Sequence, residues 1–463
     1  MKITTLFLAV LTGGVARIVN DRTGPGPENT LDSGSVTEPS GHSITNDSGN
    51  SEEIYIVAMQ DGLKDKDLES HLQLVDSKHR ASLNSSDRQF KGRQDTFFGE
   101  KYGFHGYTGS FASQVIDYIR KQPQVKSVEK DQIIHANLTL RELETDSEVE
   151  NESLKPPTRV QRRAGTLVTQ RWAPHNLRDI SHRFATKKWR PSALYKYYYD
   201  SDAGSNTYAY VVDSGVRITH KEFEGRAENG WTRYKDDYED KKGHGTHVAG
   251  IIASKTYGVV KNAHIISVKV TQDGAIAATT MINAVHWIME DIEKKNRLGR
   301  AVINMSLNIG ISEALDNLID KVFKKGVLTV AASGNEGKCA WGSPARSPNA
   351  ITVGSINTDW SVASYCNLGP VVDIFAPGAQ IPSVTYKKDT GNAKKTGTSM
   401  AAPHVAGLVL NAMSVYGITD AQKITDFLFQ TSTKDQVKGE LGGVPNRVAN
   451  NNNGKQRKPC EAV

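Results

Sequence analysis

Short apolar runs alternate with helix-length segments through the second half of the chain, and this pattern constrains the fold more than any other feature. The runs cover residues 208–212, 265–270, 301–305, 327–331 and 372–375. The helix-length segments cover 245–253, 279–295, 314–325, 399–415 and 421–429. Fully apolar strands that alternate with helices are typical of a parallel sheet covered on both faces. We therefore predict a three-layer α/β fold with a mostly parallel sheet, and a site at the carboxyl ends of its strands.

The N-terminal part of the chain is organised differently. Residues 1–16 join Lys2, a short apolar run and small residues at 14–16, which is typical of a secretory signal peptide. Residues 17–50 are polar and rich in Gly, Ser and Asn, so we interpret them as a low-complexity linker. Residues 51–137 contain two strand–helix units and predict a small α+β domain.

An acidic linker over residues 138–166 separates this small domain from the rest, and it contains the pair Arg162 and Arg163. An exposed chain offers such a pair to a dibasic-cleaving protease, and the alternative is a solvated turn. The main domain is expected over 167–450, with a polar tail over 451–463. Glycosylation sequons at Asn46, Asn84, Asn137 and Asn151 predict a glycoprotein. Asn304 also fits the sequon, but it ends an apolar strand, so we predict that it is buried and unmodified.

The charge of the chain is mild and spread along its length. Among 463 residues, 57 are Lys or Arg and 51 are Asp or Glu, which gives a formal net charge of +6. No basic stripe is interleaved with aromatic residues, which argues against nucleic acid as a partner. After the signal peptide, no apolar run approaches the ~20 residues that span a bilayer. We expect a monomer without a membrane anchor that is secreted or vacuolar.

The chain has three cysteines, Cys339, Cys366 and Cys460. Cys339 and Cys366 flank a segment rich in turn residues, so we predict a disulfide between them in an oxidising compartment. Cys460 lies in the polar tail and is expected to be free. No cysteine–histidine set has the spacing of a metal site.

One stretch joins a glycine turn, a serine and a helix of small residues. In GTSMAAPHVAG, Gly397 permits a sharp turn, Ser399 stands at the helix start and Pro403 is expected within the first turn. The backbone N–H of a serine there lies near the positive end of the helix, where a developing oxyanion is favoured. Taken alone, Ser399 is either a nucleophile or a helix cap.

Three further stretches supply a carboxylate, an imidazole and an amide. In YVVDSGV, Asp213 ends a buried strand, where it is either catalytic or a cap. In GHGTHVAG, His244 starts a helix, and His247 follows three residues later. A zinc pair of these histidines lacks a third ligand nearby, so we predict a structural role for His247. In AASGNEG, Asn335 either donates to an oxyanion or occupies a turn.

These four stretches, in this order within about residues 170–450, closely resemble subtilases, and the proteinase K-like fungal subgroup in particular. The order Asp, His, Ser is that of subtilisin. The resemblance implies a serine endopeptidase in which Ser399 is the nucleophile, His244 the general base and Asp213 its orienting carboxylate. It also implies that Asn335 and the Ser399 N–H bind the oxyanion.

The small domain resembles the inhibitory propeptide of the same family through IYIVAMQDG and VKSVEKDQIIHA. The resemblance implies a ferredoxin-like domain and a zymogen, in which the propeptide aids folding and inhibits the protease intramolecularly. Its end, near His135, Ala136 and Asn137, is expected to lie in the cleft like a product. The mature enzyme is expected to begin close to residues 164–168.

The resemblance further implies that a substrate adds as a strand between edges near 273–279 and 306–310. The substrate-binding residues are then Ser306, Leu307, Asn308, Gly310 and Gly334. Family members usually have two glycines after Ser-Leu, where this chain has Asn308 and Ile309. We therefore predict a narrower or more polar pocket for the residue before the scissile bond.

The chemistry implied by the resemblance needs no cofactor, and the partners are protein or peptide substrates. A structural calcium ion is expected on the carbonyls of Pro348 and Ala350 and on the carboxylate of Asp373, because calcium prefers hard oxygen ligands. The alternative for Asp373 is a capped turn.

Two other functions fit the sequence less well. A dibasic-specific processing protease of the kexin type usually has a β domain after the catalytic region, where this chain has a short polar tail. A catalytically silent subtilase-like binding module would have lost a catalytic position, and Asp213, His244, Asn335 and Ser399 are all present.

Overall fold

The computed structural model describes residues 53–83, 90–135, 165–184 and 196–456. The predicted signal peptide, the low-complexity linker, the four N-terminal sequons, Arg162, Arg163 and Cys460 lie outside these ranges. The expected polar tail is described as far as Gln456, and its first residue, Asn451, is buried and donates its N–H to the carbonyl of Ile180.

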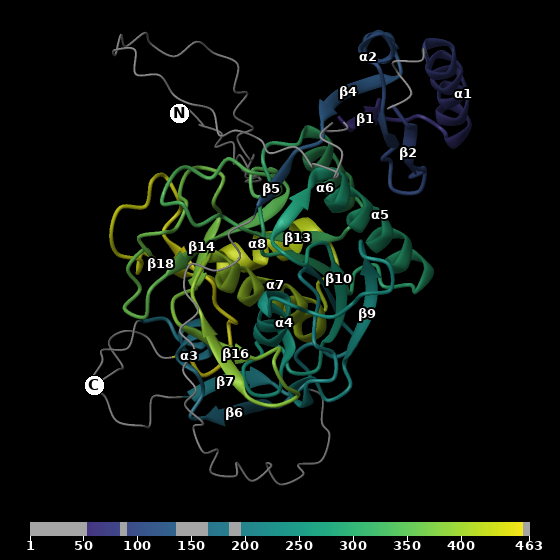
Figure 1. Ribbon diagram of the computed structural model, residues 1–463. Helices are drawn as coiled ribbons and strands as arrows, with labels where there is room; N and C mark the ends of the chain where they lie inside the picture. The colour runs from purple at the N-terminus through teal and green to yellow at the C-terminus, as the bar shows by residue number, and fades with distance from the viewer. Residues whose placement is uncertain (1–52, 84–89, 136–164, 185–195, 457–463) are drawn as a thin grey trace, which may run out of the picture. The chain divides into compact units, whose positions relative to one another are not determined.

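A nine-stranded sheet of described residues forms the centre of the main domain, in the order β18-β19-β15-β14-β13-β12-β8-β10-β9 (Figure 1). All neighbouring strands are parallel except the short pair β18 and β19 at one edge. In chain order the strands are β8 (Tyr208–Asp213), β9 (Ala227–Thr232), β10 (His264–Lys269), β12 (Ala301–Met305), β13 (Leu328–Ala332), β14 (Ala350–Ile356), β15 (Ile374–Pro377), β18 (Thr433–Lys434) and β19 (Arg447–Val448).

Helices cover both faces of this sheet, as the alternating pattern predicts. One apolar core joins the sheet to α3 (His175–Ser181), α4 (His244–Ala253), α7 (Thr398–Tyr416) and α8 (Ala421–Thr431). A second core on the other face joins it to α5 (Ala278–Lys294) and α6 (Glu313–Lys324). Among the described residues there are also three two-stranded sheets. Two lie within the main domain: β6 (Leu167–Arg171) with β7 (Lys196–Asp200), and β16 (Ile381–Val384) with β17 (Asn392–Lys395). The third pairs β11 (Ala275–Ala277) of the main domain with β5 (Ile133–His135) of the small domain. The three-layer α/β prediction is confirmed.

The expected strands and helices are present, with ends displaced by at most two residues. The pattern missed β9 and the central strand β14, although AITVGSI carries the β-branched residues that favour strands. Pro403 is also placed differently from the prediction. Because α7 begins at Thr398, Pro403 lies in the second turn and has no N–H to donate to the carbonyl of Ser399. The hydroxyl of Ser306 donates to that carbonyl instead, at 2.9 Å.

A four-stranded antiparallel sheet in the order β2-β3-β1-β4 forms the small domain. Its elements follow as β1 (Tyr55–Met59), α1 (Asp65–Ser82), β2 (Gly92–Phe97), β3 (Gly106–Ser110), α2 (Ser113–Arg120) and β4 (Val125–Lys130), which is the ferredoxin-like order. Side chains alternate across β1. Tyr55, Val57 and Met59 pack in the domain's own core with α1 and α2, whereas Ile56 and Ala58 belong to the core that contains α5 and α6.

The predicted disulfide between Cys339 and Cys366 is wrong for this structure, in which both thiols are free. Cys366 is buried, and its Sγ accepts a hydrogen bond from the Ser355 N–H at 3.1 Å, whereas Cys339 is exposed. Burial raises the pKa of the Cys366 thiol, which disfavours the thiolate needed for disulfide exchange.

Among the described residues, no single helix is long and apolar enough to cross a membrane. The pair α7 and α8, bent by 104°, meets the length and composition requirement together. Residues 398–413 of α7 are buried in the core.

The core keeps His404 of α7 neutral. Its Nδ1 donates to the Met400 carbonyl at 2.8 Å, and its Nε2 accepts from the amide of Asn176 at 2.8 Å. Burial lowers the pKa of His404 to about 3. In the unfolded chain the pKa of this histidine is ~6.5, so below pH ~6.5 the unfolded chain binds more protons than the folded chain. The free energy of unfolding therefore decreases as the pH is lowered from ~6.5 to about 3.

We expect His404 to lower the free energy of unfolding by about 2.7 kcal/mol between pH 7.5 and 4.5. Denaturant unfolding of Ser399→Ala protein, in which self-digestion is prevented, measures this change. His404→Gln is expected to lose stability at pH 7.5 but to show a flatter pH dependence. Equal pH slopes for the two proteins would contradict the neutral His404.

Candidate active site

Asp213 and His244 meet where β8 ends and α4 begins. The Nδ1–H of His244 points at the Asp213 carboxylate, 2.8 Å from Oδ1 and 2.9 Å from Oδ2. Both residues are fully buried. A side chain at Gly245 would place its Cβ 2.2 Å from the Gly215 carbonyl and 2.9 Å from the Asp213 Cβ, so only glycine lets α4 start against the end of this strand.

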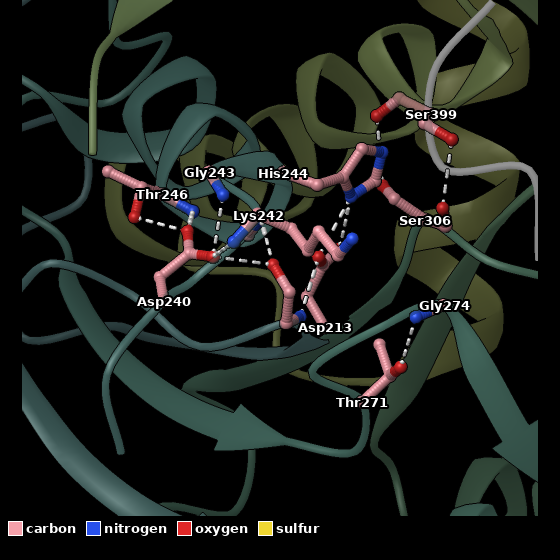
Figure 2. A network of polar contacts seen from close by, with 12 residues as sticks. Asp213, Asp240, Lys242, Gly243, His244, Thr246, Thr271, Gly274, Ser306 and Ser399 are labelled. Atoms are coloured by element: carbon pink, nitrogen blue, oxygen red, sulfur yellow. Dashed lines mark hydrogen bonds and ion pairs between the residues drawn. The ribbon is translucent and has the colours of Figure 1, made fainter. Parts of the chain in front are cut away.

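Ser399, in the first turn of α7, lies on the side of the imidazole away from Asp213 (Figure 2). Its hydroxyl donates to the Ser306 carbonyl at 2.8 Å. Among the described residues, the buried Nε2 of His244 has no hydrogen-bond partner. Catalytic hydrogen bonds often tighten only when substrate is bound. The arrangement thus leaves the basic nitrogen of His244 available to the Ser399 hydroxyl.

Asn335 follows β13 with its amide fixed beside Ser399. Its Oδ1 accepts from the Thr398 N–H at 2.8 Å and from the Thr398 hydroxyl at 2.9 Å. Because the backbone N–H can only donate, the oxygen of the amide is identified, and Nδ2 is the remaining donor. A Cβ at Gly334 would meet Asn367 Nδ2 at 2.3 Å, so this turn also requires glycine. The sequence analysis did not predict that Thr398 holds Asn335 or that Asn367 packs against Gly334. The position of Thr398 directly before Ser399 could have indicated the first of these roles.

The predicted substrate edges hold a strand of the small domain. β5 pairs antiparallel with β11 in the register Ala275 to His135 and Ala277 to Ile133. On the other side of β5, a Cβ at Gly310 would lie 2.5 Å from Gln132 Oε1. Described residues of the small domain therefore lie between the two edges where substrate was predicted. Ala136 and Asn137 lie outside the described ranges.

Two carboxylates of the small domain bind helix N-termini of the main domain, a feature that the sequence analysis missed. Glu129 accepts from the Ser312 hydroxyl at 2.5 Å and from the Glu313 N–H at 2.9 Å, at the start of α6. Asp131 accepts from the N–H and hydroxyl of Thr279 at 3.2 and 2.6 Å, at the start of α5. Burial raises the pKa of both carboxyl groups.

His247 is buried, and its Nε2–H is shared between the carbonyls of Ile381 and Ala393 at 3.0 and 3.2 Å. Burial lowers its pKa well below 6.5, which fits the predicted structural role. No group of three or more His, Cys, Asp or Glu side chains within the described ranges is placed to hold a metal ion. Asn304 is also buried, as predicted, and its amide donates to the Ser306 hydroxyl at 2.9 Å.

A buried Asp–His pair beside a serine at a helix start, with a strand of the small domain paired to β11, is the arrangement expected of a serine protease with its inhibitory domain. Residues 204–450 match the Subtilase family, and residues 54–137 match the Peptidase inhibitor I9 family. The chain belongs to the subtilase family and is a serine endopeptidase made as a zymogen.

Several known proteases are similar in sequence to this protein over most of its length. Alkaline protease 1 of Aspergillus clavatus is 36% identical over 401 residues, covering 86% of this chain and 90% of the relative. The alkaline proteinase of Hapsidospora chrysogena is 38% identical, with coverages of 86% and 92%. A crystal structure of a cold adapted subtilisin-like serine proteinase aligns with a TM-score of 0.55 at 35% identity, over 60% of this chain and 98% of that one.

Proposed function

We propose that Asp213, His244 and Ser399 form the catalytic triad of this endopeptidase. The hydrogen bonds from His244 Nδ1 to Asp213 carry the proposal, together with an Nε2 that has no partner among the described residues and lies on the side of the ring toward Ser399 (Figure 2). Nε2 takes the hydroxyl proton as Ser399 Oγ attacks the peptide carbonyl, and then gives it to the leaving amine. Asp213 holds the tautomer that exposes a basic Nε2 and stabilises the imidazolium. In the second half of the reaction, Nε2 takes a proton from water as the water oxygen attacks the acyl carbonyl, and then returns it to Ser399 Oγ as the acid product leaves.

The oxyanion of the tetrahedral intermediate is bound by Asn335 Nδ2 and by the Ser399 N–H at the start of α7. The two hydrogen bonds that Asn335 Oδ1 accepts from Thr398 support this assignment, because they fix the planar amide and with it the direction of the Nδ2 donor. Donors held in place before the reaction need no reorganisation when the charge develops.

The substrate strand replaces β5 between β11 and the segment that follows β12. The side chain of Asn308 crosses from this segment to the end of β13, where its Nδ2 donates to the Ala332 carbonyl at 2.7 Å. Its buried Oδ1 has no partner among the described residues. We assign Asn308 to the pocket for the residue before the scissile bond, where it narrows the pocket and adds a polar acceptor.

Cleavage of a peptide library, with cut sites sequenced with and without a fluorophosphonate inhibitor, tests the function. We expect inhibitor-sensitive cuts after small or polar residues. For Asn308→Gly, we expect the ratio of kcat/KM for cleavage after large apolar residues to kcat/KM for cleavage after small or polar residues to rise about tenfold, the scale of a methylene-sized change in a pocket. An unchanged preference in Asn308→Gly would remove Asn308 from the pocket. Absence of cuts from a processed, folded protein would contradict the triad proposal.

A structural calcium ion on Pro348, Ala350 and Asp373 is a further part of the proposal. Asp373 is held against the start of β14, because its N–H donates to the Thr352 carbonyl at 2.8 Å and its Oδ2 accepts from the Thr352 N–H at 2.9 Å. This arrangement holds a carboxylate near the start of β14, of which Ala350 is the first residue, with Pro348 in the turn just before it. Two carbonyls and a carboxylate are the hard oxygen donors that calcium prefers.

Removal of calcium with a chelator should lower the Tm of the inhibitor-blocked enzyme by about 5–10 °C. Asp373→Asn should show the lowered Tm without chelator and little further change with it. Asp359→Asn, at an exposed loop carboxylate bonded to Ser361, serves as the control that stays sensitive to chelator. Superimposable melting curves with and without chelator would overturn the site.

The expected destination is outside the cell, because residues 1–16 read as a secretory signal. Recovery of the protein from culture medium with a start near residues 164–168 would support both this destination and the predicted processing point.

A further inference from the structure

We infer that Asp240 is a positioning residue for the reaction, an inference that rests on the proposed roles of Asp213 and His244. Asp240 lies in the loop between β9 and α4, and its side chain is buried with the residue 4% exposed. One carboxylate oxygen accepts from the Ser214 hydroxyl at 2.8 Å and from the Gly243 N–H at 2.7 Å. The other accepts from the N–H and the hydroxyl of Thr246 at 2.9 and 2.5 Å.

These partners are sequence neighbours of the two triad residues that the carboxylate joins. Ser214 follows Asp213, whereas Gly243 and Thr246 stand on either side of His244. The Ser214 hydroxyl in turn accepts from the Gly245 N–H at 3.0 Å, so the strand end and the helix start are connected twice. Figure 2 shows Asp240 beside Gly243 and Thr246, on a different side of this network from Ser399. Asp240 therefore acts through the backbone that carries Asp213 and His244.

A helix cap alone does not explain this set of contacts. A carboxylate at a helix N-terminus satisfies otherwise unpaired N–H groups and interacts favourably with the helix dipole. The bonds to Gly243 and Thr246 meet that need. The bond to Ser214 reaches a different element, the loop after β8, and the same Ser214 hydroxyl accepts from the Gly245 N–H in the first turn of α4. It fixes the distance between the strand that ends in Asp213 and the helix that begins with His244.

The loop that carries Asp240 is anchored from a second side. Lys269, fully buried at the end of β10, donates to the Glu239 carbonyl at 2.7 Å and lies 3.1 Å from an Asp237 carboxylate oxygen. Lys269 is the register partner of Asp213 in the pairing of β10 with β8. Hydrogen bonds from Lys241 and Lys269 lower the pKa of Asp237 to about 2, so the carboxylate that pairs with Lys269 stays charged. The loop that carries Asp240 is therefore anchored at the carboxyl ends of β8 and β10.

The test is Asp240→Asn in the full-length precursor. The amide matches Asp240 in shape, but its NH₂ group cannot accept the hydrogen bonds made by one carboxylate oxygen. A misplacement of about 1 Å costs about 10²-fold in rate, so we expect kcat to fall about 10- to 100-fold with KM changed less than about twofold. The first-order rate of self-processing and the rate of Ser399 labelling by a fluorophosphonate should fall in parallel with kcat.

Two further variants separate positioning from folding. Ser214→Ala keeps the bonds of Asp240 to Gly243 and Thr246 and removes only the acceptor of the Gly245 N–H from the start of α4. We expect it to lower kcat as well, with an effect less than multiplicative in combination with Asp240→Asn. Asp291→Asn replaces a buried carboxylate that binds Tyr210, Arg297 and Lys295, and should keep the wild-type kcat.

A lowered Tm with unchanged kcat in Asp240→Asn and Ser214→Ala would reduce Asp240 to a cap and overturn the inference. A raised KM with unchanged kcat would assign Asp240 to substrate binding and also overturn it. Failure of the triad proposal is recognised separately, because Ser399→Ala would then retain activity whatever happens at Asp240.

Discussion

Ser399→Ala is expected to lower kcat by about 10⁶, the magnitude known for the triad serine of the related enzyme subtilisin. We expect the variant to keep the fold, because the one hydrogen bond of the Ser399 hydroxyl within the described residues is the bond to the Ser306 carbonyl. It cannot form the acyl-enzyme, so its precursor should remain joined to the inhibitory domain. Gel analysis of the secreted or purified chain over time measures processing, and hydrolysis of a peptide amide measures kcat.

The matched control for this change is Ser267→Ala. Ser267 is a buried serine in the middle of β10 whose hydroxyl has no partner among the described residues. Its removal leaves no donor or acceptor stranded, so processing and kcat should match the wild type. A Ser399→Ala precursor that matured by itself at the wild-type rate would remove Ser399 from the mechanism.

Asp213→Asn is expected to lower kcat by about 10⁴, the scale found when the triad aspartate is lost in other serine proteases, subtilisin included. The Asp213 carboxylate accepts from His244 Nδ1 through both oxygens and from the Ser214 N–H at 2.8 Å. An amide NH₂ facing Nδ1 favours the tautomer with the proton on Nε2, which cannot take the proton of Ser399.

Self-processing of the Asp213→Asn precursor, followed over days, gives the rate without added substrate. Asp291→Asn again serves as the buried-carboxylate control and should process normally. Retention of more than about a tenth of the wild-type rate in Asp213→Asn would exceed any effect consistent with an orienting carboxylate of this kind.

The sequence predicted most of the main domain because its strands are apolar on both faces and its helices are long. Such segments carry a strong periodic signal, which is why their ends were placed within two residues. The more polar strands β9, β2 and β3 were missed, and so was the buried central strand β14, whose run AITVGSI is interrupted by a glycine and a serine. The disulfide prediction failed because sequence separation says nothing about direction: Cys366 points into the core while Cys339 points out.

The sequence by itself supplied the candidates Asp213, His244, Asn335 and Ser399, because each stands in a glycine-rich or small-residue stretch and the four stretches together resemble those of subtilases. It also determined the order of the domains, with an inhibitor before a protease. Only the tertiary structure decided which groups support these residues, because their partners are far away in the chain. The bond of Asp240 to Ser214, the bond of Ser306 to the carbonyl left free by Pro403, and the capping of α5 and α6 by Asp131 and Glu129 each join segments that no local pattern connects. A hydrogen bond of this kind depends on distance in space, and the sequence records only distance along the chain.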